Sequence, residues 1–234
     1  MDCTRLVFIL EDAAMLSRNL EFLTELKAPP LPEEPIELFI GILCAGSHFT
    51  ERMAVRRSWM SSVRKSSITM AQFFVALNER KEVNKDLKKE VDFFGNIVIV
   101  PFADSYDMVV LKTVAICEYA THVVKAKDIM KCDGDTFVRV DSGIANLKKI
   151  PYGKSFYLGN INYYHRPLTG PAKRTRPTPM VPGYIVSSDI ANFVVSETER
   201  EKGRLNKAVQ DGGWRAVHRH GFANHSFLTY WKWW

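Results

Sequence analysis

The chain has 234 residues, of which 46% are hydrophobic and 25% charged, and its formal net charge at pH 7 is +6. This composition can build one full-sized core, or two small ones, without disulfides or a structural metal, so a single globular domain is the default. No run approaches the roughly 20 apolar residues of a membrane helix, and no signal peptide is visible, so we expect a soluble chain. The positive charge suits an anionic partner, and without a long Lys/Arg block a phosphate-bearing small molecule fits as well as nucleic acid.

Three regions are expected along the chain. Residues 1–35 form an N-terminal segment that ends in the proline-rich linker "APPLPEEP" at 28–35, which cannot be a helix or a central strand. Residues 36–196 carry alternating strand and helix patterns and form the folded domain. Residues 197–234 show no sustained period and form a divergent tail.

The folded domain alternates strands with helices. Apolar runs predict strands at 36–44, 68–77, 96–101 and 128–132. Helices are expected at 50–60, where Thr50 would be the N-cap, and at 79–92 and 106–123. Further on, "RVDSGIANLKKI" predicts a helix, 155–161 a strand, and "GYIVSSDIANFVVSE" a strand, a Ser/Asp cap and a helix. This alternation indicates an α/β fold with a mixed, mostly parallel sheet flanked by helices.

Two aspartates one residue apart, Asp133 and Asp135, follow the strand at 128–132. Asp-Gly favours the positive φ angles of a two-residue hairpin turn, whereas paired carboxylates at a strand end suit a hard divalent cation. Ligands of open α/β sheets bind at the carboxyl ends of strands. That position favours a metal site, although the segment could be both a site and a turn.

Basic residues follow the first strand. Arg52 and Arg56 share a helix face with Arg57 beside them, and such a face either binds phosphate or is merely solvated. Downstream, Asp104 and Lys112 could contact a ribose and a phosphate, or could belong to an ordinary surface loop and helix. No dinucleotide-binding or P-loop motif follows the first strand, so charges and a metal would have to hold any nucleotide.

Other chemistry is less favoured. The cysteines Cys3, Cys44, Cys117 and Cys132 have no C-x-x-C pairing and are expected to be buried free thiols. The histidines His218, His220 and His225 lack a fourth zinc ligand. A phosphatase of the haloacid-dehalogenase type is disfavoured because Thr136 directly follows Asp135, where that family normally has a glycine between them.

Four stretches in order resemble the β-1,3-galactosyltransferase family, in particular its plant hydroxyproline O-galactosyltransferases: "FIGILCAGSHFTERMAVRRSWM", "PFADSYDMVVLKT", "IMKCDGDTFVRVD" and "PGYIVSSDIANFVV". The resemblance implies a GT-A-type fold and an inverting hexosyltransferase. The donor would be UDP-galactose, the cofactor Mn²⁺ or Mg²⁺, and the acceptor a hydroxyl of a protein hydroxyproline or a glycan, with no nucleic acid partner. It also implies a Golgi lumenal location and a type II membrane anchor, which is not visible in this chain.

The resemblance also implies roles for individual residues. The family's R-x-x-x-R-x-[ST]-W pattern falls on Arg52, Arg56, Ser58 and Trp59, and its D-x-Y-x-x-[LV]-x-x-K pattern falls near Asp104, Tyr106 and Lys112. Donor binding is therefore expected at Arg52, Arg56, Arg57, Asp104, Lys112 and Asp133. The metal would be held by Asp135 and Asp133, which would face the basic helix face of Arg52 and Arg56.

The chain departs from the family pattern at several places. Gly134 stands where the family's triple aspartate has its middle acid, and the family's Glu-Asp-Val motif, which supplies the catalytic base, is absent. The nearest substitute is Asp211 in "VQDGGW". The loop between Pro167 and Pro182 also differs, and residues 1–28 look like the remnant of a galectin-like domain, which suggests a truncated product. Two functions stay open: an active transferase, or a catalytically inactive relative that acts by binding.

Overall fold

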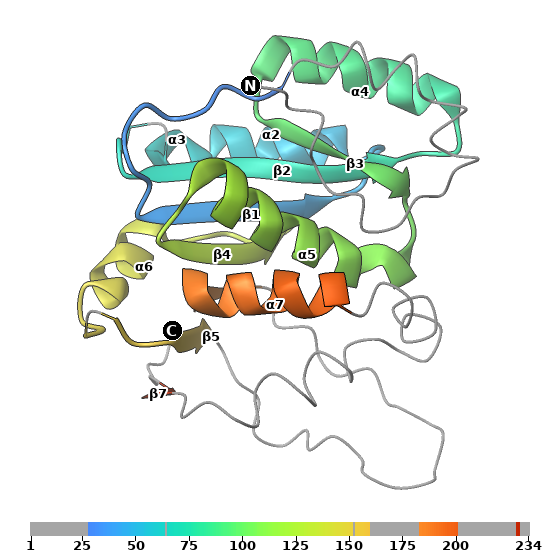
Figure 1. Cartoon of the computed structure of the whole chain (residues 1–234). Coiled ribbons are helices and arrows are strands. Elements are labelled where there is room, and N and C mark those ends of the chain that lie inside the picture. The colour runs from blue at the N-terminus through green and yellow to red at the C-terminus, as the bar shows by residue number, and fades with distance from the viewer. Residues whose placement is uncertain (1–27, 64, 152, 160–182, 201–227, 230–234) are drawn as a thin grey trace, which may run out of the picture.

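The computed structural model of the chain describes residues 28–63, 65–151, 153–159, 183–200 and 228–229 (Figure 1). Its centre is a sheet of seven strands in the order β3-β2-β1-β4-β6-β5-β7. The strands are β1 (Leu38–Cys44), β2 (Thr69–Leu77), β3 (Ile97–Ala103), β4 (Asp128–Asp133), β5 (Phe156–Gly159), β6 (Gly183–Ser187) and β7 (Leu228–Thr229). The strands from β3 to β4 in this order are parallel, whereas β6 runs antiparallel to both β4 and β5. The predicted mixed, mostly parallel sheet is therefore confirmed.

Helices connect the strands and cover both faces of the sheet. They are α2 (Phe49–Arg57), α3 (Met60–Val63), α4 (Lys81–Phe94), α5 (Val109–Glu118), α6 (Val140–Leu147) and α7 (Ser188–Arg200), with a 3-10 turn η2 (Tyr106–Met108) and a π-helical turn η3 (Tyr119–Val124). Within the described residues, none of these helices is long and apolar enough to span a bilayer.

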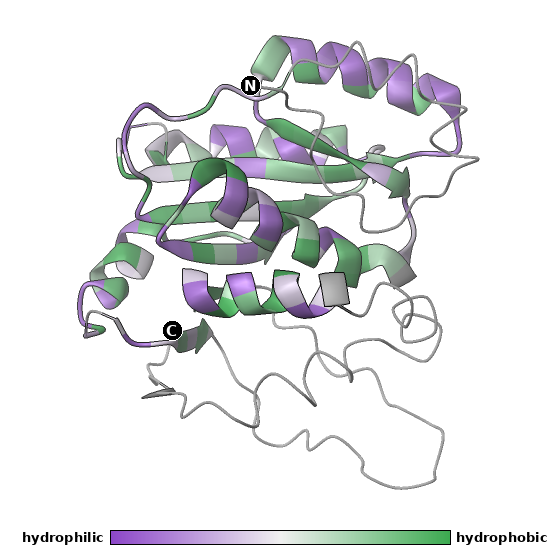
Figure 2. Cartoon of the chain, in the orientation of Figure 1, coloured by the Kyte–Doolittle hydropathy of each residue, from purple (hydrophilic) through white to green (hydrophobic). Residues whose placement is uncertain are grey.

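Two hydrophobic cores lie on opposite faces of the sheet. In β1, Phe39 and Leu43 belong to the core under α5 and α7, whereas Ile40 and Ile42 belong to the core under α2, α3, α4 and α6. This alternation follows from the period of two along a strand. Figure 2 shows β1 and β2 as largely hydrophobic, as expected for strands covered on both faces. Gly41 lets α5 approach β1, because a Cβ at this position would meet the side chain of Ile116.

The structure corrects two details of the expected elements. Helix α2 begins at Phe49 with His48 as its N-cap residue, and no side chain caps it, so the prediction that Thr50 is the N-cap is wrong. The single helix expected at 106–123 is divided into η2, α5 and η3. The predicted free thiols are confirmed for Cys44, Cys117 and Cys132, all buried, whereas Cys3 lies outside the described residues.

Asp128, at the start of β4, makes stability depend on pH. Burial raises the pKa of this carboxyl to about 6, with Lys127 lowering the pKa and Glu37 and Asp189 raising it. Because the folded chain binds this proton more tightly than the unfolded chain, the stabilisation is complete below about pH 4 and is lost as pH rises through about 6. We expect Asp128→Asn to be about 2 kcal/mol more stable than the wild type at pH 7.5, with a smaller difference at pH 4. Urea unfolding at both pH values measures this, and an equal difference at both would contradict it.

Candidate functional site

The carboxyl ends of four parallel strands meet at one edge of the sheet. Leu43, next to the end of β1, lies opposite Asp133, the last residue of β4. The loop after β1 and the turn after β4 are therefore neighbours. Asp104 follows β3 at the same edge, where its backbone N–H donates to Leu77 O of β2 at 2.8 Å.

Asp133 and Asp135 sit in a tight turn that follows β4. The backbone N–H of Thr136 donates to the Asp133 carbonyl at 3.0 Å and closes the turn. The alternative of a two-residue hairpin is wrong, because the next element is helix α6 and β4 pairs with β1 and β6. Among the described residues, Gly134 is not one of the glycines with a positive φ angle, so its backbone conformation does not explain why a glycine stands here. Gly134 instead packs against β1, where a Cβ would lie 3.2 Å from Leu43 O and 3.3 Å from Cys44 Sγ.

The two carboxylates differ in their surroundings. Asp133 is partly exposed and pairs with Lys131, whose Nζ lies 2.6 Å from Asp133 Oδ1, whereas Asp135 is exposed. No group of three or more potential metal ligands occurs in the described part of the chain. Two carboxylates are nevertheless enough for a hard divalent cation that takes its other ligands from substrate phosphates and water. The residues present fit such a cation.

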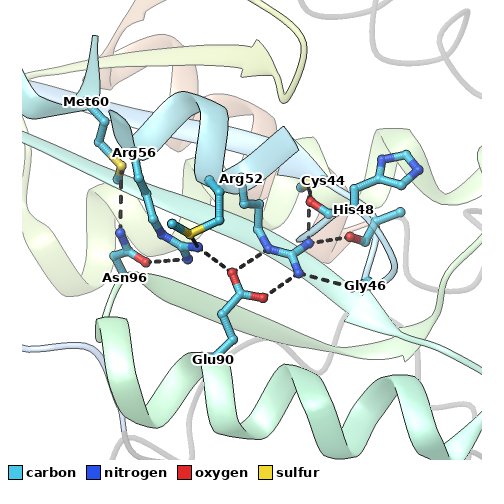
Figure 3. A network of polar contacts seen from close by, with 10 residues as sticks. Cys44, Gly46, His48, Arg52, Arg56, Met60, Glu90 and Asn96 are labelled. Carbon is cyan, nitrogen blue, oxygen red and sulfur yellow. Dashed lines mark hydrogen bonds and ion pairs between the residues drawn. The ribbon is translucent and has the colours of Figure 1, made fainter. Parts of the chain in front are cut away.

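Arg52 is buried between α2 and α4 (Figure 3). Its Nε and Nη2 donate to the two oxygens of Glu90 at 2.9 and 2.5 Å, and its Nη1 and Nη2 donate to the carbonyls of Ala45 and Gly46 at 2.6 and 3.1 Å. Burial lowers the pKa of Arg52, but its hydrogen bonds to Glu90 and its interactions with Glu90 and Cys44 outweigh this and leave that pKa raised. The guanidinium group is therefore engaged inside the fold.

Arg56 shares the same carboxylate. Its Nη1 donates to Glu90 Oε1 at 2.5 Å and its Nη2 to Asn96 Oδ1 at 2.9 Å, while its guanidinium lies 3.9 Å from the Phe94 ring centroid. The expected basic helix face that would meet the aspartates is wrong, because both arginines are buried against α4. Arg57 is exposed at the opposite end of α2 from the site edge. Donor binding by these arginines stays a prediction.

Lys112 on α5 joins two loops of this edge. Its Nζ lies 2.6 Å from Asp104 Oδ1 and donates to the Cys44 carbonyl at 3.2 Å. Lys112 is buried, and the side chain of Asp104 is nearly so. The structure brings this predicted pair together at the site edge, whereas a role in donor binding stays a prediction.

Three residues that contact the expected site residues had not been singled out from the sequence. Glu90 and Asn96 hold the arginines from α4 and from the start of β3, and Lys131 pairs with Asp133. Lys131 could have been found, because residues two apart in a strand point to the same face. Among the other expected site residues, Asp211 and the three histidines His218, His220 and His225 lie outside the described residues, as does the loop between Pro167 and Pro182.

A cysteine and two tyrosines near the charged side chains of this edge have raised pKa values. Burial raises the pKa of the Cys44 thiol, although Arg52 and Lys112 act against it. Burial also raises the pKa of Tyr157 to about 12 and that of Tyr184 well above its ordinary value. The two tyrosine rings stack with centroids 5.0 Å apart on β5 and β6. The cysteine and both tyrosines are therefore protonated and uncharged at neutral pH.

Comparison with known proteins agrees with the predicted family. A sequence model described as Galactosyltransferase matches residues 50–203. Hydroxyproline O-galactosyltransferase GALT6 of Arabidopsis thaliana is 55% identical over 210 residues, which cover 84% of this chain and 31% of the relative. Beta-1,3-galactosyltransferase GALT1 of the same plant is 36% identical over 208 residues, which cover 81% and 32%.

The chain thus spans about a third of the length of these curated relatives. Among solved structures, the galactosyltransferase LgtC in complex with donor and acceptor sugar analogues gives a TM-score of 0.40 at 10% identity. That alignment covers 79% of this chain and 66% of LgtC, and the likeness is too weak to carry an inference.

Proposed function

We propose, from the premise that this chain belongs to the galactosyltransferase family, that it moves galactose from UDP-galactose onto an acceptor hydroxyl with inversion. The observation that carries the proposal is the pair Asp133 and Asp135 in the turn at the carboxyl end of β4. Ligands of such sheets bind at this edge. Relatives named for hydroxyproline galactosylation support a protein hydroxyproline as the acceptor, in protein glycosylation. A Golgi lumenal location is part of the proposal.

The chain's own residues divide the work at this edge. Asp135, with Asp133, would hold Mn²⁺ or Mg²⁺, which when bound neutralises the charge of the departing UDP. Lys131 fixes the Asp133 carboxylate at 2.6 Å and leaves the exposed Asp135 as the more accessible oxygen ligand. Inversion also requires a base that takes the proton of the acceptor hydroxyl on the face opposite UDP. We assign this role to Asp211 as a prediction.

A second function follows from two departures from the family pattern. Gly134 replaces the middle aspartate, and the Glu-Asp-Val motif that carries the family's base is absent. A chain without its base would bind the donor and transfer nothing. Turnover of UDP-galactose by the purified chain, onto a hydroxyproline peptide or into water, excludes this alternative.

The direct test of the proposal is a calorimetric titration of UDP into the purified chain. We expect binding with Mn²⁺ present and at least about tenfold weaker binding in EDTA, because a cation held by Asp133 and Asp135 would neutralise the diphosphate charge. A titration with AMP under the same conditions controls for unspecific attraction of phosphate to a chain of net charge +6. Equal binding of UDP and AMP, or no binding of UDP, contradicts a donor site.

A further inference from the structure

Two buried cations bind three consecutive carbonyl oxygens, one at the end of β1 and two in the loop that follows it. Lys112 Nζ donates to the Cys44 carbonyl at 3.2 Å, and Arg52 donates to the carbonyls of Ala45 and Gly46 at 2.6 and 3.1 Å. Arg52 is 1% exposed and Lys112 is 4% exposed. The carbonyl of each trans peptide fixes the direction of the N–H beyond it, so these contacts fix the three peptide planes from Cys44 to Ser47. We call Arg52, Lys112 and their carboxylate partners the carbonyl clamp.

Each cation of the clamp is balanced by a carboxylate. Arg52 forms a bidentate pair with Glu90 at 2.9 and 2.5 Å, and Lys112 pairs with Asp104 at 2.6 Å. A buried charge requires such a partner, because an unpaired one is strongly destabilising. The donors of the two cations are thus directed at the loop and at these carboxylates.

The end of β1, from which the clamped loop departs, touches the aspartate turn. The carbonyl of Leu43 and the thiol of Cys44 enclose Gly134, so that a Cβ on Gly134 would lie 3.2 and 3.3 Å from them. Cys44 is the link, because Lys112 holds its carbonyl and its thiol lies beside Gly134. A shift of Cys44 with the loop would therefore move Gly134 and, with it, Asp133 and Asp135. Interiors are close-packed and transmit such a shift instead of absorbing it.

We propose that Arg52, Glu90 and Lys112 are positioning residues, which hold the β1 loop against the aspartate turn and do not contact the donor diphosphate. The identity of the ligand, UDP, rests on the proposed function, whereas the clamp itself rests on the contacts given above. The proposal gives Glu90, which lies on α4 and contacts the arginines, an indirect effect on donor binding. Arg52 on α2 would likewise affect donor binding through the loop and not by contact with the donor.

Glu90→Gln separates positioning from direct contact, because the two roles predict opposite signs. If Arg52 bound the diphosphate, removing its carboxylate partner would free positive charge and tighten UDP binding. If Arg52 positions the loop, the variant loosens it, and we expect UDP affinity in Mn²⁺ to fall about tenfold, as for other residues that support a site indirectly. Calorimetry measures the affinity, and hydrogen–deuterium exchange measures protection of segment 45–49, which we expect to decrease.

Asp86→Asn is the matched control. Asp86 lies on the same helix, α4, with its side chain 76% exposed, and pairs with the exposed Lys89. This change removes one negative charge, as Glu90→Gln does, but leaves the clamp intact. We expect UDP affinity and exchange at 45–49 to stay at wild-type values, which separates the clamp from the overall charge.

Conservative variants test the geometry further. Arg52→Lys keeps the charge but cannot reach two carbonyls and a carboxylate at once, so we expect weaker UDP binding despite the retained cation. Glu90→Asp keeps the charge on a shorter side chain and should rescue part of the loss; it also serves if Glu90→Gln fails to fold. Tighter or unchanged UDP binding in Glu90→Gln overturns the proposal. If the wild type binds no UDP, the proposed function fails, and unchanged exchange at 45–49 in Glu90→Gln would then overturn the clamp.

Discussion

Replacing Glu90 by alanine lowers the free energy of unfolding by about 3–5 kcal/mol, the range expected when one partner of a buried ion pair is removed. Glu90 is 5% exposed and accepts hydrogen bonds from Arg52 at 2.9 and 2.5 Å and from Arg56 at 2.5 Å. Without it, two buried guanidinium groups lose the carboxylate that they share. Urea denaturation followed by circular dichroism measures the change.

The remaining contacts of the arginines cannot replace the carboxylate. Arg56 keeps Asn96 Oδ1 at 2.9 Å and the Phe94 ring at 3.9 Å, and Arg52 keeps the carbonyls of Ala45 and Gly46. The groups that remain on Arg52 are neutral and leave its charge uncompensated in a region of low dielectric. A loss below about 1 kcal/mol would show that water reaches the arginines and would contradict a buried network.

Asp86→Ala on the same helix gives the comparison. Its pair with Lys89 is formed by side chains that are 76% and 78% exposed, so solvent screens it. We expect its stability to stay within about 0.5 kcal/mol of the wild type, as is usual for exposed pairs. The contrast between two acidic residues four positions apart on α4 isolates the effect of burial from that of charge removal.

The sheet could be predicted from the sequence because its strands are covered on both faces. Such strands are continuous apolar runs, and the expected strand 68–77 became Thr69–Leu77. The position of Asp133 at a strand end followed from the same pattern. The order of the strands did not, because pairing between β1 and β4 joins segments far apart in sequence.

The surroundings of the arginines could not be predicted from their own helix. A basic pair four residues apart looks the same whether solvent or a carboxylate covers it, and its partner Glu90 lies 34 to 38 residues further on. One indication exists in α4, where Glu90 shares the buried stripe of Leu87 and Val91. A charged residue at such a position needs a buried partner of opposite sign, and Arg52 or Arg56 would have been a reasonable candidate.

The family patterns meet through backbone carbonyls. Trp59 Nε1 donates to the Thr136 carbonyl at 3.0 Å, so the tryptophan of the arginine pattern holds the residue that closes the aspartate turn. Arg52 holds the loop after β1 in the same way. Trp59 and Arg52 therefore connect helix α2 to the two segments that carry the candidate site, although neither side chain points at the aspartates.

Changing Asp135 to alanine should weaken Mn²⁺-dependent UDP binding at least about a hundredfold, because Asp133 alone offers one carboxylate already paired with Lys131.

Lys131→Met should act in the opposite direction and strengthen Mn²⁺ binding. Its ammonium lies 2.6 Å from Asp133 Oδ1 and repels a second cation there. Removing it should tighten Mn²⁺ binding without nucleotide about tenfold, the Asp133 side chain being partly exposed and its charge partly screened.

Titration of Mn²⁺ alone, followed by electron paramagnetic resonance of the free ion, measures both variants without requiring turnover. Lys89→Met removes the same charge from an exposed position on α4 and should leave Mn²⁺ affinity unchanged. Weaker Mn²⁺ binding in Lys131→Met would contradict the prediction, because Lys131 would then orient Asp133 for the cation. Tighter binding would mean that the positive charge of Lys131 lowers the affinity of the aspartates for Mn²⁺ in the absence of nucleotide. This effect adds to that of Gly134, which stands where the expected triple aspartate has its middle carboxylate.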